Sequence, residues 1–73
     1  WGRGVGGALL EELIDRARAA GKHVLVARID GDNEASIRLH ERFGFQVTAR
    51  MPEVGRKFDR WLDLVYLQRI LDP

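Results

Sequence analysis

The sequence predicts an α/β fold, because two segments with helical periodicity alternate with three segments of β-strand character. With 73 residues, these segments make one small domain over residues 1–73. There are no cysteines and two histidines, so neither a disulfide nor a conventional zinc site is expected, and no metal is assigned. The predicted order is helix, strand, helix, strand, strand.

The first helix is expected to follow a glycine-rich loop that contains Gly2, Gly4, Gly6 and Gly7. After this loop, apolar residues recur at helical spacing with charged residues between them: Leu9, Leu10, Leu13, Ile14 and Ala17. Gly21 is well placed to end this helix as a C-cap.

Residues 23–29 are rich in β-branched residues and almost continuously apolar, which is typical of a buried strand in a parallel pairing. A turn follows at residues 30–33, and residues 33–43 have the pattern of a second helix. Asn33 is a suitable N-cap for that helix, and Gly44 is expected to end it.

Residues 45–51 alternate like a strand, and residues 60–70 form a second, longer strand candidate. Between them, residues 52–59 contain Pro52 and Gly55 and are predicted to form a loop. Four side chains of the last strand are expected on one face: Trp61, Asp63, Val65 and Leu67.

The charge pattern argues against nucleic acid and membrane partners. The formal net charge is +1, and the arginines are interleaved with carboxylates, so there is no continuous basic stripe. No apolar run approaches the roughly 18 residues that a membrane-spanning helix needs. The start does not resemble a signal peptide, so a cytoplasmic location is expected. A first residue of Trp1, within a glycine-rich segment, favours truncation or cleavage as the origin of the chain.

The glycine segment has the composition of a phosphate-binding loop. Unpaired N–H groups and the dipole at a helix start favour anions, and glycines let a phosphate approach the backbone. Arg3 offers a charge-assisted contact. A dinucleotide-binding loop, with Asp30 as its acidic partner, and a merely flexible turn are alternatives. A P-loop is excluded because no Gly-Lys-Ser/Thr follows.

A second block resolves these alternatives. Residues 33–45 resemble the second conserved block of the GNAT superfamily of N-acetyltransferases, an asparagine and a small residue followed by a run that ends in Gly-Phe. The glycine segment resembles the pyrophosphate motif of the same superfamily, Q/R-x-x-G-x-G/A, with matching Gly4 and Gly6. Trp1 stands where that motif has Gln or Arg.

The C-terminal residues resemble the phosphinothricin acetyltransferase branch, in which a Val-Gly-x-Lys-Phe loop precedes a Trp-x-Asp strand. His40 also fits this branch, since many GNAT enzymes have tyrosine there. The resemblance covers the whole chain but only the C-terminal half of the family's domain. It implies part of a GNAT acyl-CoA N-acyltransferase fold, with a mixed sheet in which strand 60–70 lies between the two earlier strands, antiparallel to both.

The resemblance also implies a set of site residues. The backbone of the first segment would hold the pyrophosphate of acetyl-CoA: Gly2, Arg3, Gly4, Val5, Gly6 and Gly7. Asn33 would bind the pantetheine arm, with help from Ser36, and His40 would protonate the departing thiolate. Three residues would border the acceptor pocket: Lys57, Phe58 and Trp61. Simpler roles are also open for Asn33 as a cap, His40 as a packing residue and Trp61 as a core or dimer contact.

The implied activity is direct transfer of acetyl from acetyl-CoA to the primary amine of a small amino-acid-like substrate, such as phosphinothricin or methionine sulfone or sulfoximine. The base is expected from the half of the family domain that precedes this segment, so the chain alone is expected to be inactive. The alternatives are a protein N-terminus or antibiotic as acceptor, or a non-catalytic remnant that binds coenzyme A weakly or only self-associates. A homodimer is expected, since an uncovered sheet edge and helix face favour pairing.

Overall fold

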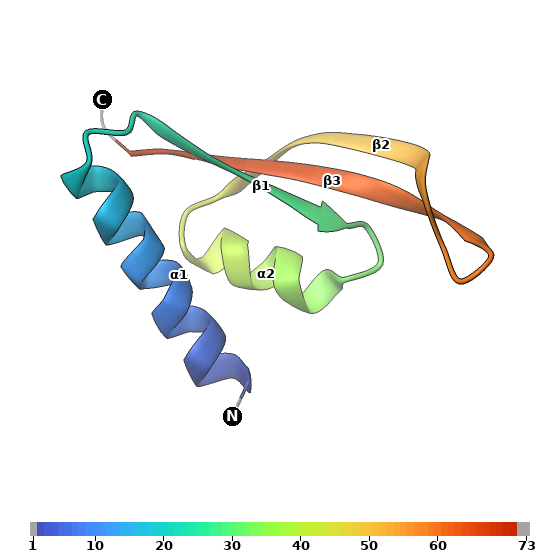
Figure 1. The fold of residues 1–73 in the computed structure, drawn as a ribbon, viewed down its shortest axis with the longest axis horizontal. Helices are drawn as coiled ribbons and strands as arrows, with labels where there is room; N and C mark the ends of the chain where they lie inside the picture. Colours follow the sequence, from blue (N-terminus) through green and yellow to red (C-terminus); the bar gives the residue numbers. More distant parts are fainter. Residues whose placement is uncertain (1, 72–73) are drawn as a thin grey trace.

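The computed structural model describes residues 2–71, with side chains from residue 6 onward. The elements are α1 (Gly2–Ala19), β1 (Val24–Asp30), α2 (Glu34–Arg42), β2 (Gln46–Lys57) and β3 (Arg60–Ile70) (Figure 1). Their order is the predicted one. Neither helix in this part of the chain is long and apolar enough to cross a membrane.

The three strands form one sheet in the order β1-β3-β2, with β3 antiparallel to both neighbours, as predicted. The parallel pairing predicted for residues 23–29 is wrong for the described residues, where β1 pairs antiparallel with β3 and the sheet is antiparallel rather than mixed. The strand is also only half-buried. Its apolar residues lie on both faces of the sheet: Ile29 is buried in the core, while Val26, on the opposite face, is 63% exposed.

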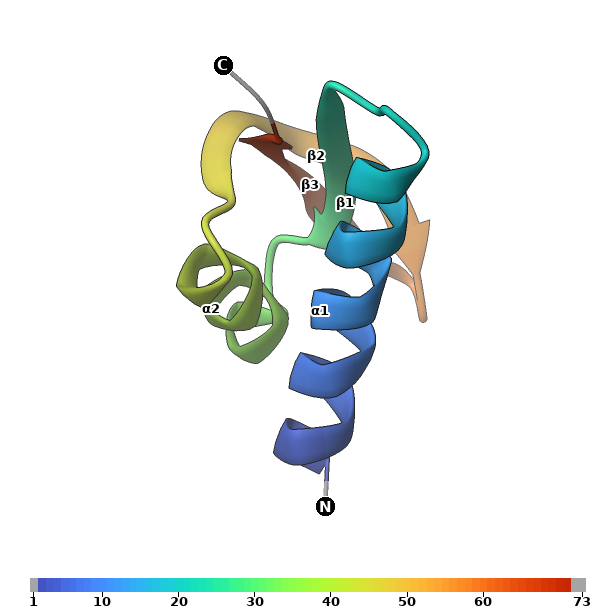
Figure 2. The same ribbon diagram turned by 90° about the vertical axis from the view of Figure 1, so that its left-hand side faces the viewer.

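Both helices lie on the same face of the sheet (Figures 1 and 2). The hydrophobic core lies between the helices and that face. The fully buried centre is Val65 and Leu67 of β3, which alternation places on the same face, as predicted. The remaining core residues come from α1, from β1, from the α2–β2 connection and from the residue after β3: Leu10, Ile14, Ala17, Ile29, Phe45 and Leu71. Leu9 and Leu13 belong to the predicted apolar stripe of α1 but are exposed, so the core side of α1 is narrower than its sequence suggests.

The helix ends agree with the predicted signals. Gly21 and Gly44 have φ angles of 75° and 87°, in the left-handed region that glycine adopts without steric cost. Asn33 is the N-cap of α2. The side chain of Arg69 lies against Gly44, and its guanidinium donates a hydrogen bond to the carbonyl of Phe43. β3 therefore fixes the C-terminal end of α2.

The glycine-rich segment is helical, and the loop predicted there is wrong: α1 begins at Gly2. Glycine in a helix interior is unfavourable by about 1 kcal/mol relative to alanine, so a tertiary contact has to compensate. Gly6 and Gly7 supply one, because they lie where α1 meets α2. A Cβ atom at Gly6 would be 3.3 Å from the side chain of Leu39, and one at Gly7 would be 3.5 Å from that of Phe43. Small residues let the two helices approach.

The loop predicted at residues 52–59 is also wrong, since β2 continues through most of it. Pro52 lies in a bulge between Met51 and Gly55, where β2 has extra residues relative to β3. The connection to β3 shrinks to Phe58 and Asp59, whose φ angles of 50° and 61° match a two-residue hairpin turn. Proline and glycine mark an irregularity within the strand here, and not its end.

Candidate functional site

Asn33, at the start of α2, uses only the oxygen of its side-chain amide in a hydrogen bond within the described part of the protein. The Oδ1 atom of Asn33 accepts a hydrogen bond from the backbone N–H of Ser36 at 3.2 Å, and the side chain is exposed. This confirms the capping role. Because the cap uses the oxygen, the NH2 group of Asn33 remains available as a donor to a ligand beside the helix start.

The His40 ring is held at two points. Its Nδ1 atom lies 2.7 Å from the backbone carbonyl oxygen of Ser36, which can only accept, so Nδ1 carries the hydrogen. The ring packs edge-on against Phe45, with centroids 5.2 Å apart and planes at 79°. The packing role is thus real. The Nε2 atom, on the other side of the ring, is the one left for chemistry, and it gains a hydrogen when the ring is protonated.

Helical spacing brings three of the predicted residues to one side of α2. Asn33, Ser36 and His40 are separated by three and four residues, so they follow one another along the same face. Ser36 and His40 are both half-buried, while Asn33 is exposed at the end. The predicted pantetheine and proton-donor residues therefore form one continuous strip.

The first turns of α1 lie beside this helix (Figure 2). Because α1 begins at Gly2, the unpaired N–H groups of its first turn belong to the predicted pyrophosphate segment. Gly6 packs against Leu39, the residue before His40. Of the other predicted residues there, Gly2, Arg3, Gly4 and Val5 are described only as helical backbone. Trp1 lies outside the described residues.

The predicted acceptor residues gather at the β2–β3 hairpin. Lys57 and Phe58 line a hollow of about 310 Å³ together with Asp30, Asp32, Arg60 and Leu62. Trp61 lines an adjoining hollow of about 240 Å³, which shares Asp32, Arg60 and Leu62 and adds Gly31, Arg50 and Asp63. Phe58 and Trp61 are 87% and 58% exposed, so Trp61 is not a core residue. The guanidinium of Arg56 lies over the Trp61 ring, 4.8 Å from the ring centroid, in a cation–π contact.

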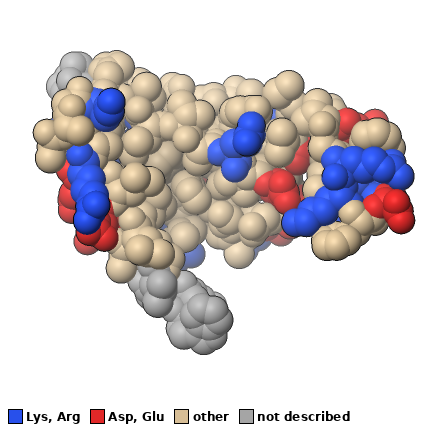
Figure 3. All heavy atoms as spheres, in the orientation of Figure 1, with Lys and Arg blue, Asp and Glu red and all other residues tan. Residues whose placement is uncertain are grey.

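Charges of both signs gather at this end of the molecule (Figure 3). Arg60 forms an ion pair with Asp32, which joins β3 to the turn between β1 and α2. Arg56 pairs with Asp59 across the hairpin at 3.8 Å. Because the Asp59 side chain is fully exposed and those of Arg60 and Asp32 are more than half exposed, solvent screens both pairs and they add little to the stability of the fold. Their main effect is on the electrostatics of the two hollows, whose lining contains both anionic and cationic side chains.

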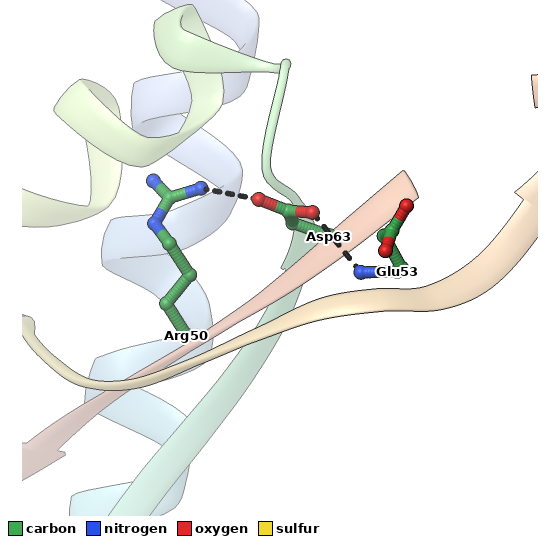
Figure 4. Close-up of polar contacts among 3 residues, drawn as sticks. All are labelled: Arg50, Glu53 and Asp63. Atoms are coloured by element: carbon green, nitrogen blue, oxygen red, sulfur yellow. Dashed lines mark hydrogen bonds and ion pairs between the residues drawn. The ribbon is translucent and has the colours of Figure 1, made fainter. Parts of the chain in front are cut away.

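One part of the site is not evident from the sequence (Figure 4). The Oδ2 atom of Asp63 lies 3.5 Å from Nη1 of Arg50. Its Oδ1 atom also accepts a hydrogen bond from the backbone N–H of Glu53 at 3.1 Å, and its carbonyl oxygen accepts one from Gly31 at 2.8 Å. The only signal in the sequence is the Trp-x-Asp pattern, which identifies the aspartate but not these partners.

Comparisons with known proteins agree with this architecture. The model of the acetyltransferase (GNAT) family matches residues 1–45. The L-methionine sulfoximine/L-methionine sulfone acetyltransferase of Pseudomonas paraeruginosa is 57% identical over 72 residues, which are 99% of this chain and 42% of that protein. The phosphinothricin N-acetyltransferase of Streptomyces coelicolor is 46% identical over 70 residues, 96% of this chain and 41% of that protein.

Among solved structures, yncA from Salmonella typhimurium, determined with its cofactor acetyl-CoA, superposes with a TM-score of 0.94. It is 60% identical, and the match covers 99% of this chain and 42% of that one. The chain thus spans about two fifths of the length of the proteins it matches. A family model that matches more than half of the chain, together with this superposition, shows that the chain belongs to the GNAT acetyltransferase family.

Proposed function

We propose that this chain is the acetyl-CoA-binding, C-terminal part of an N-acetyltransferase that acts on the primary amine of a small amino-acid-like substrate. The observation that carries the proposal is the extent of the match. Relatives named for L-methionine sulfoximine, L-methionine sulfone and phosphinothricin align with 96–99% of this chain, so the similarity includes the hairpin as well as the helices.

Acetyl-CoA is the proposed cosubstrate, and it lies along α2 in this proposal. Its pyrophosphate is bound by backbone N–H groups at the first turn of α1, where the helix dipole favours negative charge. The pantetheine arm accepts a hydrogen bond from the NH2 group of Asn33 and passes Ser36. The shared face of Asn33, Ser36 and His40 supports this path, because it leads from the helix start toward the imidazole.

In the proposed reaction, the neutral amine nitrogen attacks the thioester carbonyl carbon, so that a C–N bond forms and the C–S bond then breaks. The electron pair of the C–S bond goes to sulfur. His40 donates its Nε2 proton to that thiolate and becomes a neutral ring. In this neutral ring Nδ1 keeps its hydrogen, which it donates to the carbonyl oxygen of Ser36. The amine also has to lose a proton, and no residue among 6–71 is proposed as the base for that step.

The hairpin is the proposed border of the acceptor pocket. The ammonium group of Lys57 suits a carboxylate or phosphinate, and the exposed rings of Phe58 and Trp61 offer apolar walls to the substrate side chain. We also propose a homodimer. The sheet face opposite the helices carries exposed apolar side chains that a second subunit would cover, among them Val24, Val26 and Ile70.

A panel of acceptors tests the function. The protein that carries this sequence is incubated with acetyl-CoA and, separately, with methionine sulfone, methionine sulfoximine, phosphinothricin, a peptide with a free N-terminus and an aminoglycoside. Thiol release is expected with the first three and not with the last two. Release only with the peptide or the aminoglycoside would contradict the acceptor class, and no release with any of them would contradict the activity itself.

Asn33→Asp separates the two roles of this residue. Aspartate is as good an N-cap as asparagine, so the free energy of unfolding is expected to change by less than about 0.5 kcal/mol. It has no N–H donor, however, so KM for acetyl-CoA is expected to rise about tenfold. Steady-state kinetics and urea unfolding measure the two quantities. An unchanged KM would mean that Asn33 is a cap alone.

A further inference from the structure

The bulge of β2 contains a residue in an unfavourable backbone conformation. Glu53 has a φ angle of 55°, a left-handed value that residues other than glycine adopt infrequently. Its backbone N–H donates across to the Oδ1 atom of Asp63 on β3 (Figure 4). This bond replaces the strand pairing that is interrupted between Met51 and Gly55. The carboxylate of Asp63 thus holds the bulge in its observed shape.

Two further contacts hold Asp63 itself. Arg50 lies 3.5 Å from its other carboxylate oxygen, and the N–H of Gly31 donates to its backbone carbonyl. The turn at Gly31 is also packed tightly onto this pair. A Cβ atom at Gly31 would lie 2.7 Å from Nη1 of Arg50 and 2.8 Å from Cβ of Asp63. The position of the carboxylate is therefore fixed relative to the turn that leads into Asn33.

The bulge determines where the hairpin tip points. Beyond it, β2 and β3 pair regularly again from Gly55 opposite Leu62 to Lys57 opposite Arg60. Since a bulge bends and twists its strand, the direction of this short hairpin depends on the conformation at Glu53. We propose that Asp63 is a positioning residue: by holding the bulge it aims Lys57 and Phe58 at the acceptor, and so sets the affinity for the acceptor substrate.

This inference rests on the proposed function, since it concerns the acceptor side of the same site. A purely stabilising role fits the contacts less well. The side chains of Arg50 and Asp63 are 50% and 37% exposed, so solvent screens their attraction. The hydrogen bond to Glu53 and the close packing against Gly31 fix the geometry of the bulge and of the adjoining turn.

Asp63→Ala tests the proposal in the protein that carries this sequence. KM for the acceptor is expected to rise about tenfold, the scale of one hydrogen bond to a charged group, while KM for acetyl-CoA and kcat stay within about twofold. Asp63→Asn retains an oxygen that can accept from Glu53, and its acceptor KM is expected to rise less than about threefold. Asp63→Ser, whose hydroxyl is too short to reach that N–H, is expected to behave like Asp63→Ala and serves if the alanine variant does not fold.

Glu12→Gln is the matched control, because it removes a carboxylate from an exposed ion pair with Arg16 on α1. All its kinetic constants are expected to stay unchanged. If Asp63 were merely structural, its variants would lose active protein and thermal stability at an unchanged acceptor KM, and that result would overturn the inference. Acetyl transfer by the unsubstituted protein is measured first, so that a failure of the proposed function is recognised separately from a failure of this proposal.

Discussion

His40→Asn is expected to lower kcat for acetyl transfer about 100-fold, the lower range for loss of a general acid. The asparagine amide can donate to the carbonyl of Ser36 in place of Nδ1, so the contact within α2 is retained. What is lost is a proton donor at the position of Nε2. Because the substitution leaves the proposed coenzyme contacts at Asn33 and the start of α1 in place, KM for acetyl-CoA is expected to change less than about threefold. Steady-state thiol release measures both constants.

His40→Tyr provides the comparison. Many GNAT enzymes carry tyrosine at the position that His40 matches, and its hydroxyl is also a proton donor. We expect this variant to retain kcat to within about tenfold of the parent. If His40→Asn kept kcat to within threefold, His40 would be only the packing residue that its contacts with Ser36 and Phe45 describe.

Leu67→Ala is expected to lower the free energy of unfolding by about 2–5 kcal/mol. Leu67 is a fully buried residue of β3 on the face of the sheet that the two helices cover. Its replacement by alanine leaves a cavity there. Small domains are stable by only about 5–15 kcal/mol in total, so this single change removes a large part of the margin. Urea unfolding followed by circular dichroism measures it.

Leu9→Ala is the matched control, since the same atoms are removed from a side chain that is 62% exposed on α1. Its effect is expected to stay within about 0.5 kcal/mol. Equal losses in the two variants would contradict the assignment of the core to the face of the sheet that the helices cover.

The predictable parts of the fold were those with strong local signals. Periodicity and caps located both helices, since Asn33 and Gly44 restrict the backbone in ways that depend little on distant residues. The two wrongly predicted loops involve glycine and proline. Gly6 and Gly7 are helical because α2 lies against them, and Pro52 lies within a strand because β3 continues opposite it. Both outcomes depend on tertiary contacts that a local pattern does not contain.

The candidate site also has a part that local sequence patterns predict and a part that depends on tertiary contacts. The strip of Asn33, Ser36 and His40 follows from helical spacing alone once α2 is located. The bonds from Gly31 and Glu53 to Asp63 could not be predicted, because they join the β1–α2 turn and the β2 bulge to the middle of β3. The bulge itself was interpreted as a loop. The Trp-x-Asp pattern contains Asp63, but it gives no information about the partners of that side chain.

In the proposed complex, acetyl-CoA binds from the first turn of α1 along the face of α2. Titration of the isotope-labelled protein with acetyl-CoA, followed by backbone amide shifts in NMR spectra, tests this binding mode most directly. We predict that the largest shifts fall in residues 2–7 and 33–40, while those of the hairpin turn at residues 58–59 stay small. Saturable binding whose shifts concentrate in the hairpin, with residues 2–7 and 33–40 unaffected, would contradict it.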